Sequence, residues 1–122
     1  MSHDRIDAEK AVLGAMMIDP AAVDRGKVLL DPSYFTTDAH RKIAWHMYHL
    51  HEIGRSVDQL SVGDILHRGD LLDGVGGVEA LAELASYVAT GKNIDHNCKL
   101  VLQAHLKDEL DKVEKDDANT DD

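Results

Sequence analysis

The chain has 122 residues, 43% of them hydrophobic, which leaves room for one domain with a modest core. Its single cysteine, Cys98, excludes an internal disulfide. The sequence has no run of about 18 apolar residues and no apolar N-terminus, so we predict neither a membrane span nor a secretory signal. We therefore expect a cytoplasmic protein. The net charge is −10, half of it in residues 107–122, and no segment concentrates Lys and Arg, which argues against direct binding of nucleic acid.

The first predicted helix covers residues 7–17 and the second covers residues 20–29. Asp19 followed by Pro20 separates them, because Asp is a favoured N-cap and Pro suits the first position of a helix. Pro32 then restricts the residue before it to extended or turn conformations, so a connection is expected there. The aromatic residues of this connection, which we expect to enter the core, are Tyr34 and Phe35.

A third helix is predicted over residues 38–54, and we expect the rest of the chain to pack around it. Asp38 is a suitable N-cap and Gly54 a suitable terminator. Trp45 lies about 200° around the helix from Ile43 of the apolar stripe, so its ring needs a partner outside that stripe. The stripe consists of Ala39, Ile43, Met47 and Leu50.

Three further helices are predicted over residues 59–68, 78–88 and 93–113. We expect Gly69, in the left-handed conformation, to end the helix of residues 59–68, and a turn to follow at residues 70–77. Thr90-Gly91-Lys92 is expected to separate the helix of residues 78–88 from the last one. Beyond Leu106 the apolar stripe narrows to single residues, which is typical of a seam against one other helix. Residues 114–122 are acidic without an apolar anchor, so we expect them to be disordered.

The absence of β-strand patterns and internal repeats predicts an all-α fold. We expect about six helices, with a globular bundle over residues 1–92 and a protruding arm over residues 93–113, like the first half of a helical hairpin. The expected core residues recur at helical spacing or lie in the aromatic connection. They are Val12, Leu13, Met16, Phe35, Ile43, Met47, Leu50, Leu81 and Leu84.

Motifs for catalysis and cofactor binding fail on their spacing. Gly91-Lys92 lacks the earlier Gly and the following Ser or Thr of a phosphate-binding loop, because Ser86 and Asn93 stand at those positions. A dinucleotide-binding fingerprint follows a β-strand, but no strand is predicted before the glycines of residues 74–77. Cys98 lies on an apolar stripe, where a thiol usually acts as a small hydrophobe. We therefore predict no catalytic residues and no cofactor.

Four of the eight histidines lie on or near the third helix. Only His46 and His49, three residues apart, approach the four-residue spacing that is typical of a helical metal pair. No second Cys and no matching His or acidic pair is evident, so we assign no metal ligands. A metal-binding domain that uses this His-rich helix is kept as an alternative hypothesis. The four residues are His40, His46, His49 and His51.

Five weak motifs follow one another along the chain. In their order and spacing they resemble the N-terminal domain of DnaB-type replicative DNA helicases over about residues 6–110. The resemblance implies a helical bundle and a helical hairpin that form a collar on the hexameric helicase and dock primase or loader proteins. It implies no catalysis, because ATP hydrolysis belongs to a separate RecA-like domain. The motifs are AEKAVLGAMMIDP (8–20), Phe35 with His40, Arg41 and Ile43, Gly54 with Asp58, RGDLLDGVGGVEALAELA (68–85), and Asn93-Ile94.

Two departures from the family pattern bear on binding. The family usually has a large apolar residue followed by a polar one where this chain has Ala44 followed by Trp45. The second helix of the hairpin is also missing from the sequence, so the stripe of the last helix lacks its usual cover, and exposed stripes tend to find partners. The expected partner or oligomer surface comprises Trp45, Tyr48, Leu102, Leu106, Leu110 and Val113.

Together these features indicate a non-catalytic protein–protein interaction module of DNA replication. We expect self-association, as a dimer or a higher oligomer, and docking of a replicative helicase, a primase or a helicase loader, without direct contact with nucleic acid or membrane. An alternative is a free-standing phage- or plasmid-encoded regulator that loads or inhibits a host helicase, which the acidic end after residue 115 favours.

Overall fold

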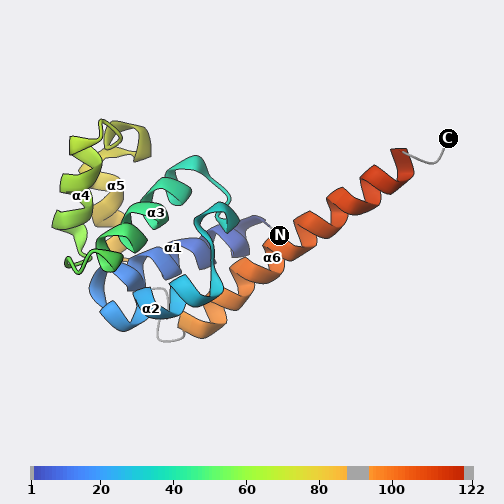
Figure 1. Cartoon of the computed structure of the whole chain (residues 1–122), viewed down its shortest axis with the longest axis horizontal. Coiled ribbons are helices and arrows are strands. Elements are labelled where there is room, and N and C mark those ends of the chain that lie inside the picture. The colour runs from blue at the N-terminus through green and yellow to red at the C-terminus, as the bar shows by residue number, and fades with distance from the viewer. Residues whose placement is uncertain (1, 88–93, 120–122) are drawn as a thin grey trace.

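The computed structural model describes the backbone of residues 2–87 and 94–119 and the side chains of residues 5–87 and 94–114. These residues form six α-helices and two short 3-10 helices and contain no β-strand, which confirms the predicted all-α class. Figure 1 shows a bundle from which one end of the last helix extends. In chain order the elements are α1 (Ser2–Ile18), α2 (Pro20–Leu29), η1 (Pro32–Tyr34), α3 (Asp38–Glu52), α4 (Gln59–Arg68), η2 (Asp73–Val75), α5 (Gly77–Ala85) and α6 (Ile94–Asn119).

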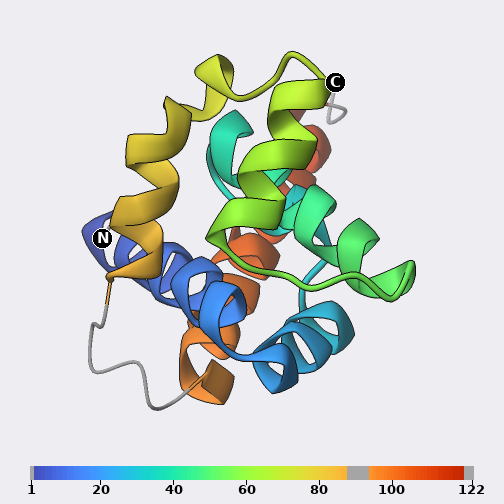
Figure 2. The same cartoon turned by 90° about the vertical axis from the view of Figure 1, so that its left-hand side faces the viewer.

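α1 has the most extensive packing of the helices, and it shares the centre of the bundle with α3, the expected organising helix, which packs against α1, α2, α4 and both 3-10 helices. α1 packs against α2, α3, α5 and α6, and its contact with α6 is the most extensive between any two elements. A Cβ on Gly14 would lie 2.3 Å from the carbonyl oxygen of Leu84, so the close approach of α1 to α5 requires glycine. At the end of the molecule away from the protruding part of α6, α4 and α5 lie side by side (Figure 2).

The helices begin at residues whose side chains accept hydrogen bonds from the first turn. Asp19 caps α2 as predicted, accepting a bond from the backbone N–H of Ala21 at 3.0 Å. The predicted cap of α3 is wrong by one residue, because Thr37 is the N-cap, with its Oγ1 accepting from the N–H of His40. Asp38 instead lies in the first turn, where its carboxylate pairs with Lys42 at 2.7 Å.

The turn after α4 and the end of α5 depart from the prediction in detail. Gly69 follows α4 but has a φ of −89°, and the left-handed residue is Asp70, with a φ of 61°. The N–H of Leu71 then reaches back to the carbonyl of Leu66 at 2.8 Å, so the turn closes one residue later than expected. α5 ends at Ala85, earlier than the predicted residue 88, and the predicted interruption at residues 90–92 lies outside the described residues.

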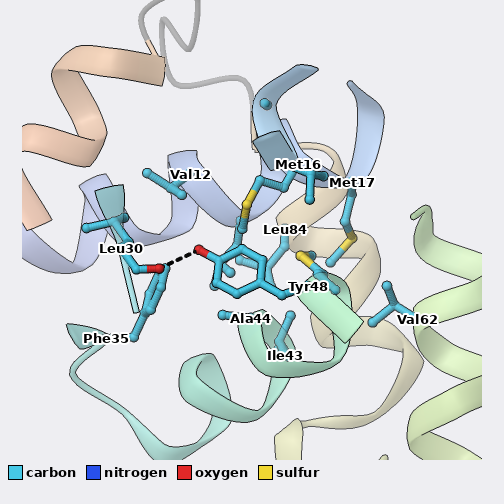
Figure 3. Close-up of a cluster of buried hydrophobic side chains, with 14 of the residues drawn as sticks. Val12, Met16, Met17, Leu30, Phe35, Ile43, Ala44, Tyr48, Val62 and Leu84 are labelled. Atoms are coloured by element: carbon cyan, nitrogen blue, oxygen red, sulfur yellow. Dashed lines mark hydrogen bonds between the residues drawn. The ribbon is translucent and has the colours of Figure 1, made fainter. Parts of the chain in front are cut away.

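The core lies between α1, α3 and the helices that cover them. All nine residues expected there are buried, and none exposes more than 5% of its surface. Figure 3 shows Tyr48 among them, with its hydroxyl donating to the carbonyl oxygen of Leu30 at 3.0 Å. Tyr48 was expected on the partner surface, but it is only 8% exposed, and burial raises its pKa above the ordinary value.

Small neighbours explain why Tyr48 lies inside the protein. Ala44, one turn earlier on α3, is fully buried and leaves room for the tyrosine ring. On α2, a Cβ at Gly26 would lie 3.3 Å from the Tyr48 hydroxyl and 2.7 Å from the sulfur of Met16. Ala44 and Gly26 are thus small residues next to Tyr48 in the core.

α6 continues beyond its predicted end. It runs from Ile94 to Asn119, so residues 114–119 are helical where disorder was expected, and residues 120–122 lie outside the described residues. No Gly or Pro occurs between these ends to break the helix. The carboxylate of Glu109 lies 3.9 Å from Nε2 of His105, one turn earlier, and 3.6 Å from Nζ of Lys112, one turn later. Beyond the body the helix extends alone (Figure 1).

Candidate interaction surface

The part of α6 that leaves the body carries an exposed apolar stripe. Leu106, Leu110 and Val113 are 55%, 58% and 54% exposed, and they recur at intervals of four and three residues. Such spacing places them on one face of the helix, which suits packing against a single further helix. Leu102, which was expected on the same surface, is half-buried and packs partly against the core, so it forms the base of the stripe.

Two contacts hold α6 at the point where it leaves the body. The guanidinium of Arg5 on α1 donates to the carboxylate of Asp108, and a second nitrogen of Arg5 donates to the carbonyl of Tyr34 at 3.1 Å. The ring of Tyr34 stacks on His105 of α6, with the ring centroids 3.9 Å apart. The hydrogen bond from Arg5 holds the pKa of Asp108 below its ordinary value. We call these four residues the arm clamp.

A buried polar network lies beneath the arm clamp. Glu9 on α1 is fully buried, and its carboxylate lies 2.7 Å from Nδ1 of His40 on α3 and accepts the backbone N–H of Thr36 at 2.9 Å. The Thr36 hydroxyl also donates to Glu9, and the Nε of Arg5 lies 3.5 Å from the same carboxylate. These partners satisfy a buried carboxylate that would otherwise be costly to remove from water. The network ties α1 to α3 and to the connection before it.

This network was not predicted, although the sequence contained a signal for it. Glu9 stands three residues before Val12 and four before Leu13, so its side chain falls on the apolar stripe of α1. A carboxylate in that position needs partners inside the protein. Glu9 and His40 also belong to two of the sequence motifs, so these motif residues have a structural role here.

Trp45 provides a second exposed apolar feature on α3. Its ring is 53% exposed, stacks on His49 with centroids 5.3 Å apart, and meets His46 edge-on at 4.9 Å. Together with Pro32 and Lys42, it lines a shallow depression of about 530 Å³. Trp45 therefore lies off the core face, and aromatic surface of this kind is common at protein interfaces.

The histidines of α3 do not converge on one point. His40 faces Glu9, His46 bonds the carbonyl of Lys42 at 2.7 Å, His49 stacks on Trp45, and His51 lies 3.0 Å from Asp24. No group of three or more His, Cys, Asp or Glu side chains is close enough to hold a metal ion among the residues that the structure describes. Each histidine is accounted for by a separate local contact.

The other features weighed for chemistry occupy structural positions. Cys98 is fully buried on α6, and burial raises the pKa of its thiol to about 11, which keeps it protonated near neutral pH. Gly76 and Gly77, with φ values of 105° and 75°, form the turn into α5. Gly91 and Lys92 lie outside the described residues. Within the described chain, no helix is long and apolar enough to cross a membrane.

Comparison with known proteins gives one consistent result. The family described as the DnaB-like helicase N-terminal domain matches residues 1–103. The chain is 38% identical over 96 residues to the replicative DNA helicase DnaB of Geobacillus stearothermophilus and, over the same length, to the replicative DNA helicase DnaC of Bacillus subtilis. Each match covers 79% of this chain and 21% of the relative, so the chain spans about a fifth of their length.

A solved structure shows the same fold. The N-terminal domain of DnaB helicase from Mycobacterium tuberculosis superposes with a TM-score of 0.79 at 30% sequence identity. The match covers 83% of this chain and 70% of that one. The similarity therefore includes most of the bundle.

Proposed function

This chain belongs to the family of DnaB-like helicase N-terminal domains, and on that premise we propose that it is a non-catalytic protein–protein interaction module of DNA replication. In this proposal it associates with further copies of itself and docks a replicative helicase, a primase or a helicase loader. The observation that carries the proposal is the stripe of Leu106, Leu110 and Val113, which is more than half exposed on a helix that extends from the body.

Several features support an interaction role over a catalytic one. The described residues contain no β-strand, and so nothing of the sheet on which a RecA-like ATPase domain is built. The polar side chains that meet in the body, Glu9 and His40, are engaged with each other and closed off from solvent. The exposed features are apolar instead, on α6 and at Trp45, as expected of a surface that binds protein.

The stripe on α6 fits a helix as its partner. Leu106 to Val113 spans about 10 Å at the 1.5 Å rise of an α-helix, and the residues between them are charged, so the apolar seam is narrow. Lys107 and Glu114 flank the seam, which lets an antiparallel second copy place each lysine near a glutamate of its partner. Self-association through α6 is thus the simplest way to cover the stripe.

Size-exclusion chromatography with light scattering tests self-association. The wild-type chain is expected to have a mass above that of a monomer, and Leu106→Asp to shift it towards the monomer while the helical circular dichroism spectrum stays unchanged. Val28→Asp is the matched control, because Val28 is also exposed but lies on α2 and is not part of the stripe on α6. A wild-type chain that is strictly monomeric at all concentrations would contradict this part of the proposal.

Pull-down with purified helicase, primase and loader tests docking. Retention of at least one of these by the wild-type chain, with loss in Leu106→Asp or Trp45→Ala, is the expected result. Failure to retain any of the three would remove the docking half of the proposal.

The same exposed stripe also fits a regulator that engages a separate helicase. In that case the added chain changes the rate of DNA unwinding by the helicase, and Leu106→Asp abolishes the change. An unwinding rate that is unaffected by an excess of the wild-type chain would favour the simple domain.

A further inference from the structure

A second apolar surface lies between α4 and α5, at the opposite end of the molecule from the protruding part of α6 (Figure 1). It is a groove of about 500 Å³ whose apolar lining includes Leu60, Leu72, Val78 and Leu81. Leu60 is 83% exposed, more than any other large apolar side chain described, and Val78 on the facing helix is 58% exposed. Single exposed apolar residues are ordinary, but two that line one groove from facing helices form a continuous surface.

The floor of the groove depends on a glycine inside a helix. Gly63 lies in the middle of α4 and lines the groove. A Cβ there would meet only the Cδ1 of Leu81, at an ordinary contact distance of 3.6 Å, so neither crowding nor an unusual backbone angle requires glycine. Glycine in a helix interior costs about 1 kcal/mol relative to alanine. Glycine at position 63 therefore leaves the part of the groove beside Leu81 unfilled.

The segment that forms this groove carries a net negative charge. Residues 57–85 carry six acidic side chains and one basic one, whereas residues 1–56 carry eight acidic and seven basic ones. The one base, Arg68, is paired with Asp64 at 2.9 Å. Asp73 and Glu79 border an adjacent depression that shares Leu72 and Val78 with the groove. Arg68 is thus the one basic residue of α4 and α5, and its charge is already paired with Asp64, which leaves Asp73 and Glu79 as the acidic side chains beside the groove without an ion pair to either helix.

We propose that this groove is a docking site for a cationic amphipathic helix of a partner protein. Apolar side chains of that helix lie between Leu60 and Val78, and its lysines or arginines face Asp73 and Glu79. The inference deepens the proposed function, since it rests on the chain being an interaction module and assigns the surface and the chemistry of one partner.

Charge separates this occupant from the alternatives. The end of a second copy, residues 107–122, has a net charge of −5, the same sign as the rim of the groove. A nucleic acid is excluded for the same reason, because its phosphates are negative. The groove also lies far from the arm in Figure 1, so a partner there leaves the stripe on α6 free.

Fluorescence anisotropy with two labelled peptides tests the proposal. The first is a synthetic helix of about 18 residues with leucines on one face and lysines on the others, and the second has glutamate at every lysine position. The cationic peptide is expected to bind the full chain at roughly 0.15 M salt at least about tenfold more tightly than the acidic one. Equal binding of the two peptides would overturn the charge argument.

A matched pair of variants locates the binding site. Leu60→Ser is expected to weaken binding of the cationic peptide by about tenfold, the effect of removing one apolar anchor from an interface. Val28→Ser is the control, because Val28 is 82% exposed on a helix of the same length, and a change below about twofold is expected there. Equal weakening by the two substitutions would show non-specific attraction to an acidic protein and overturn the proposal.

Light scattering on the same variants separates the remaining outcomes. A lower mass in Leu60→Ser would mean that a second copy occupies the groove, which contradicts the proposal. Self-association that is lost in Leu106→Asp, without binding of the cationic peptide, would refute the groove proposal and leave the proposed function in place. A monomeric chain that binds the peptide in a Leu60-dependent way would refute self-association and leave the groove proposal in place.

Discussion

The two halves of α6 share one spacing of apolar residues but have opposite environments. In the first half Cys98 and Val101 are fully buried against the body, whereas in the second half Leu106, Leu110 and Val113 each expose more than half of their surface. The change occurs at the arm clamp, where Tyr34 stacks on His105 and Arg5 bonds Asp108. Periodicity thus identifies the face of a helix that can be buried, and the neighbouring elements decide whether it is.

The two halves of α6 also differ in what a substitution in them changes: the unfolding of the domain or its association with other molecules. The first half belongs to the same buried core as α1 and α3, so substitutions there act on the unfolding of the whole domain. In the second half the stripe of Leu106, Leu110 and Val113 stays more than half exposed, although the arm clamp ties this part of α6 to the body. Substitutions in the stripe therefore act on association with other molecules. Substitutions on the two sides of the arm clamp test this division.

Among substitutions in the buried part of the protein, Glu9→Ala is expected to lower the free energy of unfolding the most. It leaves His40, Thr36 and Arg5 without their shared carboxylate, and breaking a buried charged network by removing one partner costs about 3–5 kcal/mol. Urea denaturation measures the free energy of unfolding. Glu52→Ala is the control, because Glu52 is exposed and pairs with Lys27 at 3.6 Å on the surface, and its effect is expected to be below about 1 kcal/mol. Equal effects would contradict the assigned role of Glu9.

Leu13→Ala and Leu110→Ala compare the same substitution in the two regions. Leu13 is fully buried on α1, so its truncation is expected to lower the free energy of unfolding by about 2–5 kcal/mol. For Leu110 a change within about 0.5 kcal/mol is expected. Denaturation at low protein concentration avoids contributions from association. A loss of about 2 kcal/mol or more in Leu110→Ala would mean that the stripe is covered within the folded monomer.

The hydrogen bond between Arg5 and Asp108, at the boundary between the two halves of α6, is expected to weaken at acidic pH. The hydrogen bond from Arg5 lowers the pKa of Asp108 from 3.8 in the folded state, so its stabilising effect is complete above pH 3.8 and is lost as the pH falls through the lowered value. NMR titration of the Asp108 carboxyl is expected to give a midpoint below 3.8, which Arg5→Gln raises towards 3.8. A midpoint that Arg5→Gln leaves unchanged would show that the arm clamp does not form in solution.

Trp45→Ala is expected to have only a small effect on stability. Its ring is more than half exposed and touches His46 and His49 on its own helix, so a change below about 1 kcal/mol in unfolding free energy is expected. Thermal melting followed by circular dichroism measures it, and light scattering on the same sample reports association. A large fall in melting temperature would place Trp45 among the residues that stabilise the bundle.

Much of the local structure followed from the sequence. The pattern of residues 59–68 predicted α4 with the ends that it has, and Asp19 followed by Pro20 predicted the start of α2. Helical spacing also indicated which side chains face inward, and the nine expected core residues are all buried. These features depend on neighbouring residues in the chain, through capping, backbone restriction and the 3.6-residue period, so the sequence by itself determined them.

Other features were decided only by tertiary structure. The central position of α1, the burial of Tyr48 beside Gly26, and the pairing of Glu9 with His40 each depend on elements far apart in the chain. The same holds for the surfaces: the spacing of α6 is uniform, but only packing against α1 and α2 covers its first half and leaves the second open. Burial is a property of what lies next to a side chain in space, and local spacing does not contain that information.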